Sequence, residues 1–144
     1  MTAPVFGTRV IGETEKALSA LLRQQLAGTG ITEPQWVTLT LAAAGGTTID
    51  HDQLVAQVTD ALKVSEAAAA EHIAELTTAG LLIVGDAASV SVAATARAQW
   101  TSVRSTIARI TEGLWGDLPA EDLTTAARVL TTVLTRTNAL LAAA

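Results

Sequence analysis

Residues 63–82 predict one helix with a defined start and end, and this stretch constrains the fold of the chain more than any other. Ser65 is a residue type favoured at the N-cap, and Glu66 places a negative charge in the first turn, where it suits the positive end of the helix dipole. Gly80 can end the helix, because glycine adopts the left-handed conformation at a helix C-terminus without steric cost. The sequence therefore predicts a helix between Ser65 and Gly80.

This helix has two faces of different chemistry. Ala69, Ile73 and Leu76 follow an i, i+4, i+7 spacing and share one face. The residues expected on the opposite face are small, polar or acidic: Ala67, Glu71, Ala74, Glu75 and Thr78. One side is therefore expected to pack against the protein, while the other side is presented to a binding partner.

The segment before this helix predicts a second helix that is joined to it by a short turn. Residues 51–62 carry an apolar stripe at i, i+4, i+8, and Asp50 can act as the N-cap with Gln53 three residues further on, as in a capping box. Residues 47–49 are a candidate short strand. Two helices connected in this way are typical of a helix-turn-helix.

The segment after the helix predicts a β-hairpin. Residues 81–84 and 90–92 are short apolar runs typical of strands. The residues between them can form a tight turn: Gly85, Asp86, Ala87, Ala88 and Ser89. A hairpin directly behind a helix-turn-helix would form a wing.

A sequence motif earlier in the chain indicates the same architecture. Six residues of segment 30–39 match a known pattern position by position: Gly30, Ile31, Thr32, Gln35, Trp36 and Leu39. This phrase, the helix from Ser65 to Gly80 and the strand exit leading to Arg97 together resemble the MarR family of winged-helix transcriptional regulators. The resemblance covers about residues 12–141. It implies a mainly α fold, with a winged helix-turn-helix, a small β-hairpin wing and long terminal helices that form a dimerisation region.

The same resemblance implies that helices from both ends of the chain pair in a homodimer. Apolar residues at helical spacing predict helices at about 12–27, 93–114 and 119–141. The residues expected at the dimer interface are Leu18, Leu22, Leu26, Leu123, Leu130, Leu134 and Leu141. We expect the 144 residues to form a single domain, with a winged lobe at about 33–92 and dimerisation helices at about 12–27 and 93–142.

Composition favours helices and a cytoplasmic location. Hydrophobic residues make up 49% of the chain, but many are alanine, and aromatic residues make up 3%. The chain has no cysteine, which excludes disulfides and thiolate metal sites. Its N-terminus lacks the apolar core of a signal peptide, and no apolar run reaches the roughly 18 to 20 residues that span a bilayer. We therefore expect a cytoplasmic protein that does not associate with membranes.

Little in the sequence points to catalysis. Asp50, His51 and Asp52 form the one local cluster of polar groups, but adjacent residues at a helix start point in different directions. The chain has neither a phosphate-binding glycine pattern nor a serine nucleophile elbow. We expect no enzymatic activity, no metal site and no cofactor.

The three tryptophans allow two interpretations. Trp36, Trp100 and Trp115 can be residues of the core or of the dimer interface. Alternatively they can line a small-molecule pocket between the dimer helices and the winged lobe, where many members of the family bind aromatic or phenolic effectors. The sequence identifies no effector.

The charge distribution conflicts with the DNA binding that the resemblance implies. Residues 33–92 hold one lysine and eight acidic residues, a net charge of −7, and no arginine or lysine lies between Lys63 and Arg97. DNA binding draws much of its affinity from cations that neutralise phosphates, and base readout favours donor side chains. The surface expected to face DNA lacks both: Ser65, Glu66, Ala67, Ala68, Ala70 and Glu71.

Two hypotheses follow from these observations. The first is a MarR-like homodimeric transcriptional regulator that contacts DNA, with help from cations on the dimer helices. The second is a MarR-like dimer that has lost DNA binding and acts through a protein partner or a small-molecule ligand.

Overall fold

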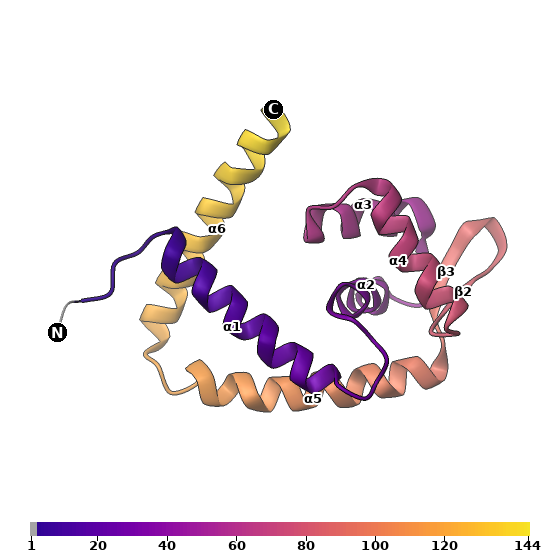
Figure 1. Cartoon of the computed structure of the whole chain (residues 1–144), viewed down its shortest axis with the longest axis horizontal. Coiled ribbons are helices and arrows are strands. Elements are labelled where there is room, and N and C mark those ends of the chain that lie inside the picture. The colour runs from indigo at the N-terminus through magenta and orange to yellow at the C-terminus, as the bar shows by residue number, and fades with distance from the viewer. Residues whose placement is uncertain (1–2) are drawn as a thin grey trace. The chain divides into compact units, whose positions relative to one another are not determined.

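The computed structural model describes residues 3–144 and divides them into two compact units, one ending at Ile107 and the other comprising Ala108–Ala144. Figure 1 shows the elements along the chain. In chain order they are α1 (Thr8–Leu26), α2 (Glu33–Ala44), β1 (Ile49–Asp50), α3 (His51–Leu62), α4 (Glu66–Thr78), β2 (Leu82–Val84), the short 3₁₀ turn η1 (Asp86–Ala88), β3 (Ser89–Val92), α5 (Ala94–Trp115) and α6 (Ala120–Ala143).

Side-chain caps start α2 and α3, and the cap of α3 is the residue that the sequence predicts. The Thr32 hydroxyl accepts a hydrogen bond from the Gln35 backbone N–H at 3.3 Å, and the Gln35 side chain accepts one from the Thr32 N–H at 3.1 Å. This reciprocal pair is a capping box, which satisfies backbone donors that a helix start leaves free. The Asp50 carboxylate accepts from the Gln53 N–H at 3.2 Å and starts α3 in the same way.

Both ends of α4 are fixed by local bonds. The Ser65 hydroxyl accepts from the Ala68 N–H at 3.1 Å, so the predicted N-cap is confirmed. Gly80 has a φ of 78°, and the Leu81 N–H donates to the Leu76 carbonyl at 2.9 Å. This long bond around a left-handed glycine is the Schellman arrangement, which satisfies the last carbonyls of a helix.

The three strands form a small antiparallel sheet in the order β1-β3-β2. Leu82 pairs with Val92 in the predicted wing hairpin, and the hairpin is therefore confirmed. β1 pairs with β3 through Ile49 and Val90, a pairing that the sequence analysis did not predict. The candidate strand at 47–49 is shifted, because only residues 49 and 50 reach the edge of β3.

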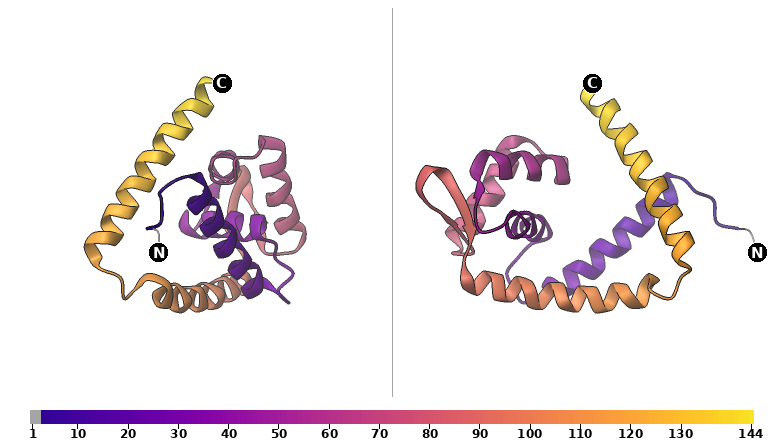
Figure 2. Two further views of the ribbon diagram at one scale, coloured as in Figure 1. Left: turned by 60° about the vertical axis from the view of Figure 1, so that its left-hand side comes forward. Right: turned by 180° about the vertical axis from the view of Figure 1, so that it is seen from behind.

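The core of the first unit lies where α2, α3 and α4 meet the sheet. In Figures 1 and 2, α2 lies between α3 and the first half of α5. The largest side chains that are fully buried are Leu39, Leu54, Ile73, Leu76, Leu82, Val58, Val90 and Thr38. Trp100 joins α5 to this core, because its indole N–H donates to the Thr40 hydroxyl at 3.0 Å.

One helix starts earlier than expected. α1 begins at Thr8, four residues before the expected start near residue 12, so Gly12 lies inside the helix, whereas α5 ends at Trp115, one residue beyond its expected end. A glycine inside a helix costs only about 1 kcal/mol relative to alanine, which neighbouring interactions can offset. In α1 one such interaction is the ion pair between Arg9 and Glu13, one turn apart at 2.8 Å.

The second unit contains the end of α5, a turn and α6. α6 has no buried residue along its length. Several of its apolar side chains are more than 45% exposed, namely Leu130, Leu134, Leu140 and Leu141. None of the helices within residues 3–144 is long and apolar enough to cross a membrane.

Candidate nucleic-acid interface

The outer face of α4 is the surface that a helix-turn-helix would present to DNA. Ala69, Ile73 and Leu76 are at most 1% exposed and fix the inner face against the core. All five residues predicted on the opposite face are exposed: Ala67, Glu71, Ala74, Glu75 and Thr78. The caps fix both ends of α4, and the buried residues fix its inner face. The residues of the outer face can therefore be identified from the sequence of the helix itself.

The expected contact residues form a shallow surface in the first half of α4. Four of them are exposed, namely Ser65, Glu66, Ala67 and Glu71, whereas Ala68 and Ala70 are half-buried. Ser65 is the single hydroxyl, and that hydroxyl accepts the capping bond. The remaining side chains offer methyl groups or carboxylate acceptors.

The charge of this surface is negative, and the one cation of the lobe is paired. Lys63 has a left-handed backbone conformation, with a φ of 55°, at the turn between α3 and α4. Its ammonium group lies 3.1 Å from the carboxylate of Asp60. On α4 itself, the His72 ring nitrogen Nδ1 lies 3.1 Å from the Glu75 carboxylate. Glu66 and Glu71 have no cationic partner among the residues that the structure describes.

The wing has no basic side chain at its tip. The Gly85 N–H donates to the Ser89 carbonyl at 2.7 Å and closes the turn. Asp86, Ala87 and Ala88 are exposed, and Ser89 is half-buried. The wing therefore presents one carboxylate and small side chains where a DNA-binding wing needs donors.

The first cation after the wing is Arg97, near the start of α5. The Ala93 N–H donates to the Leu81 carbonyl at 3.0 Å, which fastens the entry of α5 to the base of the wing. Arg97 follows one turn later and is half-buried. Two turns further on, the guanidinium of Arg104 stacks over the ring of Trp100, 4.9 Å from its centroid.

Solved structures of known proteins share this arrangement. A MarR family transcriptional regulator from Silicibacter pomeroyi DSS matches with a TM-score of 0.75 and 18% identity, covering 92% of this chain and 89% of that chain. CouR from Rhodococcus jostii RHA1, bound to p-coumaroyl-CoA, matches with a TM-score of 0.74 and 11% identity, covering 87% and 89%. NadR in complex with 4-hydroxyphenylacetate matches with a TM-score of 0.71 and 19% identity, covering 90% and 96%.

The fold is that of the MarR-family transcriptional regulators. The fold that the resemblance implied, a mainly α winged helix-turn-helix, is thereby confirmed. No model of a protein family matches the chain, and no curated protein sequence matches it either. The similarity to solved structures therefore shows the fold of this chain and not the function of its surface.

Two of the three tryptophans lie in the core of the MarR-like fold. Trp36 and Trp100 are each 8% exposed and belong to the same buried cluster. Trp115 lies in the second unit and is 41% exposed. Trp36 and Trp100 are thus packed in the core of the first unit, and a ligand pocket lined by the three tryptophans stays a prediction.

The leucines expected at a dimer interface differ in how much surface they offer. Leu26 is 4% exposed within the single chain, because it is part of the core of the first unit. Leu22 packs against the same core. Leu123 is half-buried, whereas the other four are at least 38% exposed: Leu18, Leu130, Leu134 and Leu141. These four have apolar surface for a partner, and Leu26 has almost none.

The polar cluster at the start of α3 has a structural role. Asp50 caps the helix, and the His51 ring nitrogen Nδ1 lies 3.8 Å from a carboxylate oxygen of Asp52, whose side chain is 99% exposed. Across the described part of the chain, no three residues among His, Cys, Asp and Glu are grouped so that they could hold a metal ion.

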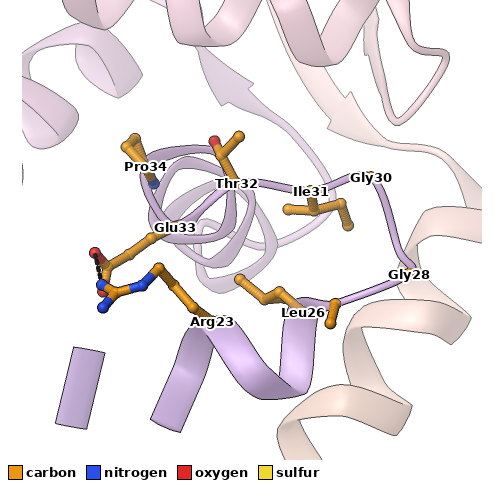
Figure 3. A pocket seen from close by; sticks show the side chains of 9 residues that line it. Arg23, Leu26, Gly28, Gly30, Ile31, Thr32, Glu33 and Pro34 are labelled. Carbon is orange, nitrogen blue, oxygen red and sulfur yellow. Dashed lines mark ion pairs between the residues drawn. The ribbon is translucent and has the colours of Figure 1, made fainter. Parts of the chain in front are cut away.

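One open surface depression lies where the sequence predicts no site. Its volume is about 580 Å³, and it is lined by the end of α1, the following loop and the start of α2 (Figure 3). Its polar wall is formed by Arg23 and Glu33. The sequence feature that marks this place is the Gly28-Thr29-Gly30 turn, which separates two helices.

Proposed function

We propose that this chain is a homodimeric transcriptional regulator of the MarR type that contacts DNA through its winged lobe. The observation that carries this proposal is the position of α4, a helix capped at both ends and packed by one face, between a preceding helix and a hairpin wing. In helix-turn-helix proteins this second helix enters the major groove. The match to regulators of the MarR family supports the same role.

The proposed dimer is supported by apolar surface that the single chain leaves uncovered. Leu130, Leu134 and Leu141 of α6 are 46%, 54% and 56% exposed. Burying apolar surface stabilises an assembly by roughly 25 cal/mol for each Å², and large uncovered apolar faces mark interaction sites. A second copy of the chain is the partner that the resemblance implies for this face.

DNA contact by this lobe would depend on groups other than a basic recognition helix. Ala67 can contact a thymine methyl group, and Glu71 can accept a hydrogen bond from a cytosine amino group. Phosphate contacts would have to come from arginines outside the lobe, such as Arg97 at the base of the wing. We therefore expect weak binding that depends little on salt compared with a basic winged helix.

The second candidate is a MarR-like dimer that does not bind DNA and acts through a protein partner or a small-molecule ligand. The acidic outer face of α4 and the pairing of Lys63 with Asp60 favour it, because they leave the lobe without a free cation among the described residues 33–92. Two of the matched structures hold small molecules, namely CouR with p-coumaroyl-CoA and NadR with 4-hydroxyphenylacetate, which supports a ligand-binding role for such a fold.

Fluorescence anisotropy with DNA from around the gene of this protein tests the proposal. Measured at low and at moderate salt, binding that weakens with salt, although less steeply than for a basic winged helix, supports DNA contact through phosphates, and binding without any salt dependence counts against it. If no binding occurs even at low salt, the regulator that contacts DNA is refuted and the second candidate remains. Sedimentation that finds a monomer would contradict both candidates, because each requires the exposed apolar helices to pair.

A further inference from the structure

The outer edge of the wing hairpin is open within the part of the chain that the structure describes. In the sheet order β1-β3-β2, β2 has β3 on one side, and no other strand of residues 3–144 pairs with its other side. The hairpin projects from the helices of the first unit (Figure 2). An open strand edge presents unpaired backbone groups, to which another extended chain can add.

The hydrogen bonds to β3 show which backbone groups of β2 face this open edge. The Gly85 N–H donates to the Ser89 carbonyl at 2.7 Å, so Gly85 bonds toward β3. In an antiparallel pair, residues that bond to the neighbouring strand alternate with residues whose backbone groups point the other way. Ile83 therefore bonds toward β3, whereas the N–H and C=O groups of Leu82 and Val84 point to the open edge.

Both exposed side chains of β2 are apolar. Leu82 is 1% exposed and belongs to the core that α4 shares, but Ile83 and Val84 are 53% and 46% exposed. Successive side chains of a strand point to opposite faces, so Val84 shares the face of Leu82 and Ile83 lies on the outer face. Proteins often protect an open edge with a lysine or a proline, and β2 has neither.

The charge around this edge favours a basic partner. The lobe of residues 33–92 has a net charge of −7, and no lysine or arginine lies between Lys63 and Arg97. Asp86 directly follows β2, is exposed and has no cationic partner among the described residues. Complementary charge speeds the association of two proteins and suppresses wrong partners. A second copy of the chain would bring a lobe of the same charge to the edge, which opposes the pairing of two wings.

We propose that the open edge of β2 binds an extended segment of a protein partner in which lysine or arginine alternates with apolar residues. The backbone of the segment bonds to Leu82 and Val84, and its apolar side chains lie beside Ile83. Its basic side chains lie on the other face, where their aliphatic stems cover Val84 and their charged ends reach toward the carboxylates of the lobe. Because β2 has three residues, these side chains must add to the few backbone bonds. The inference rests on the second candidate function, a dimer that acts through a protein partner, and names the surface and the chemistry of that partner.

Isothermal titration calorimetry of the full chain with a short peptide of alternating lysine and valine, KVKVKVK, tests the inference. Three control peptides separate the contributions. EVEVEVE reverses the charge, KKKKVVV keeps the composition without the alternation, and KVKVKVK with N-methylated backbone amides keeps the side chains but cannot donate backbone hydrogen bonds. We expect KVKVKVK to bind at least tenfold more tightly than each of the three.

Hydrogen exchange followed by ¹⁵N NMR shows where the peptide binds. The Val84 amide should exchange at least tenfold more slowly with the peptide bound, whereas the Ile83 amide, which already bonds toward β3, should change little. Val84→Lys places a positive charge on the edge and should weaken peptide binding at least tenfold. Val5→Lys makes the same substitution at a residue that is 78% exposed and precedes α1, and it should leave peptide binding unchanged. Circular dichroism would confirm that both variants fold.

The inference is overturned if any control peptide binds as tightly as KVKVKVK, if Val5→Lys weakens binding as much as Val84→Lys, or if no peptide binds at millimolar concentration. Slow exchange of the Val84 amide in the protein alone that becomes fast on dilution would also overturn it, because a second copy would then occupy the edge. The DNA anisotropy and the sedimentation experiment do not depend on the peptide. Failure of this inference can therefore be distinguished from failure of the proposed function.

Discussion

Replacing Glu71 by lysine would test whether the acidic face of α4 limits DNA binding. Glu71 is exposed and has no cationic partner within the described residues, so the substitution changes the charge of the surface by two units without removing a structural bond. A lysine at this position of the helix can reach a phosphate. One added phosphate contact changes the slope of log K against log salt by about −0.9, which corresponds to roughly eightfold tighter binding at 0.1 M salt.

The assay is fluorescence anisotropy over a series of salt concentrations, with Asp117→Lys as the matched control. Asp117 is exposed in the turn between α5 and α6, so its substitution makes the same change in net charge at a residue that belongs to the second unit and not to α4. We expect Glu71→Lys to steepen the salt dependence and Asp117→Lys to have little effect. Equal effects of both variants would mean that net charge alone governs binding. No effect of Glu71→Lys would mean that α4 does not face DNA.

Three further predictions concern stability and assembly. Ser65→Ala removes the acceptor for the Ala68 N–H and should lower the free energy of unfolding by about 1 kcal/mol, measured by urea denaturation; no change would show that the cap bond contributes nothing. Thr40→Val leaves the Trp100 indole N–H without its acceptor and should cost about 1 to 3 kcal/mol; a double-mutant cycle with Trp100→Phe should give a coupling energy near 1 kcal/mol, and additive effects would contradict the bond. Leu134→Glu places a charge on the exposed face of α6 and should yield a folded monomer in sedimentation; a dimer that persists would exclude this face from the interface.

The helix boundaries that could be predicted are those that local chemistry determines. Thr32, Asp50 and Ser65 each cap a helix because the acceptor and its donor lie three residues apart, and that spacing is visible in the sequence. The start of α1 was wrong because a single glycine carries a small penalty, which an ion pair one turn long can offset. A side-chain cap thus predicts a helix end correctly, whereas a single glycine does not.

Contacts between distant segments could not be predicted in the same way. The pairing of Ile49 with Val90 joins residues 41 positions apart, and two residues are too few to show the alternating pattern of a strand. The bond from Trp100 to Thr40 likewise depends on how α5 passes α2. The sequence left open whether Trp36 and Trp100 were core or pocket residues, because the same large aromatic side chain suits both. The depression beside Arg23 was missed because its charges lie ten residues apart on two helices.

The acidic character of the candidate site, by contrast, was visible from the sequence. It can occur together with a fold typical of DNA-binding proteins, because different residues determine the fold and the surface charge. The fold of α4 depends on the Ser65 cap, the inner face of Ala69, Ile73 and Leu76, and the left-handed Gly80. None of these residues is on the outer face. Substitutions among Ala67, Glu71 and their exposed neighbours therefore cost little stability, since surface changes usually stay within about 0.5 kcal/mol. A winged helix can therefore keep its architecture while its outer face changes from one partner to another.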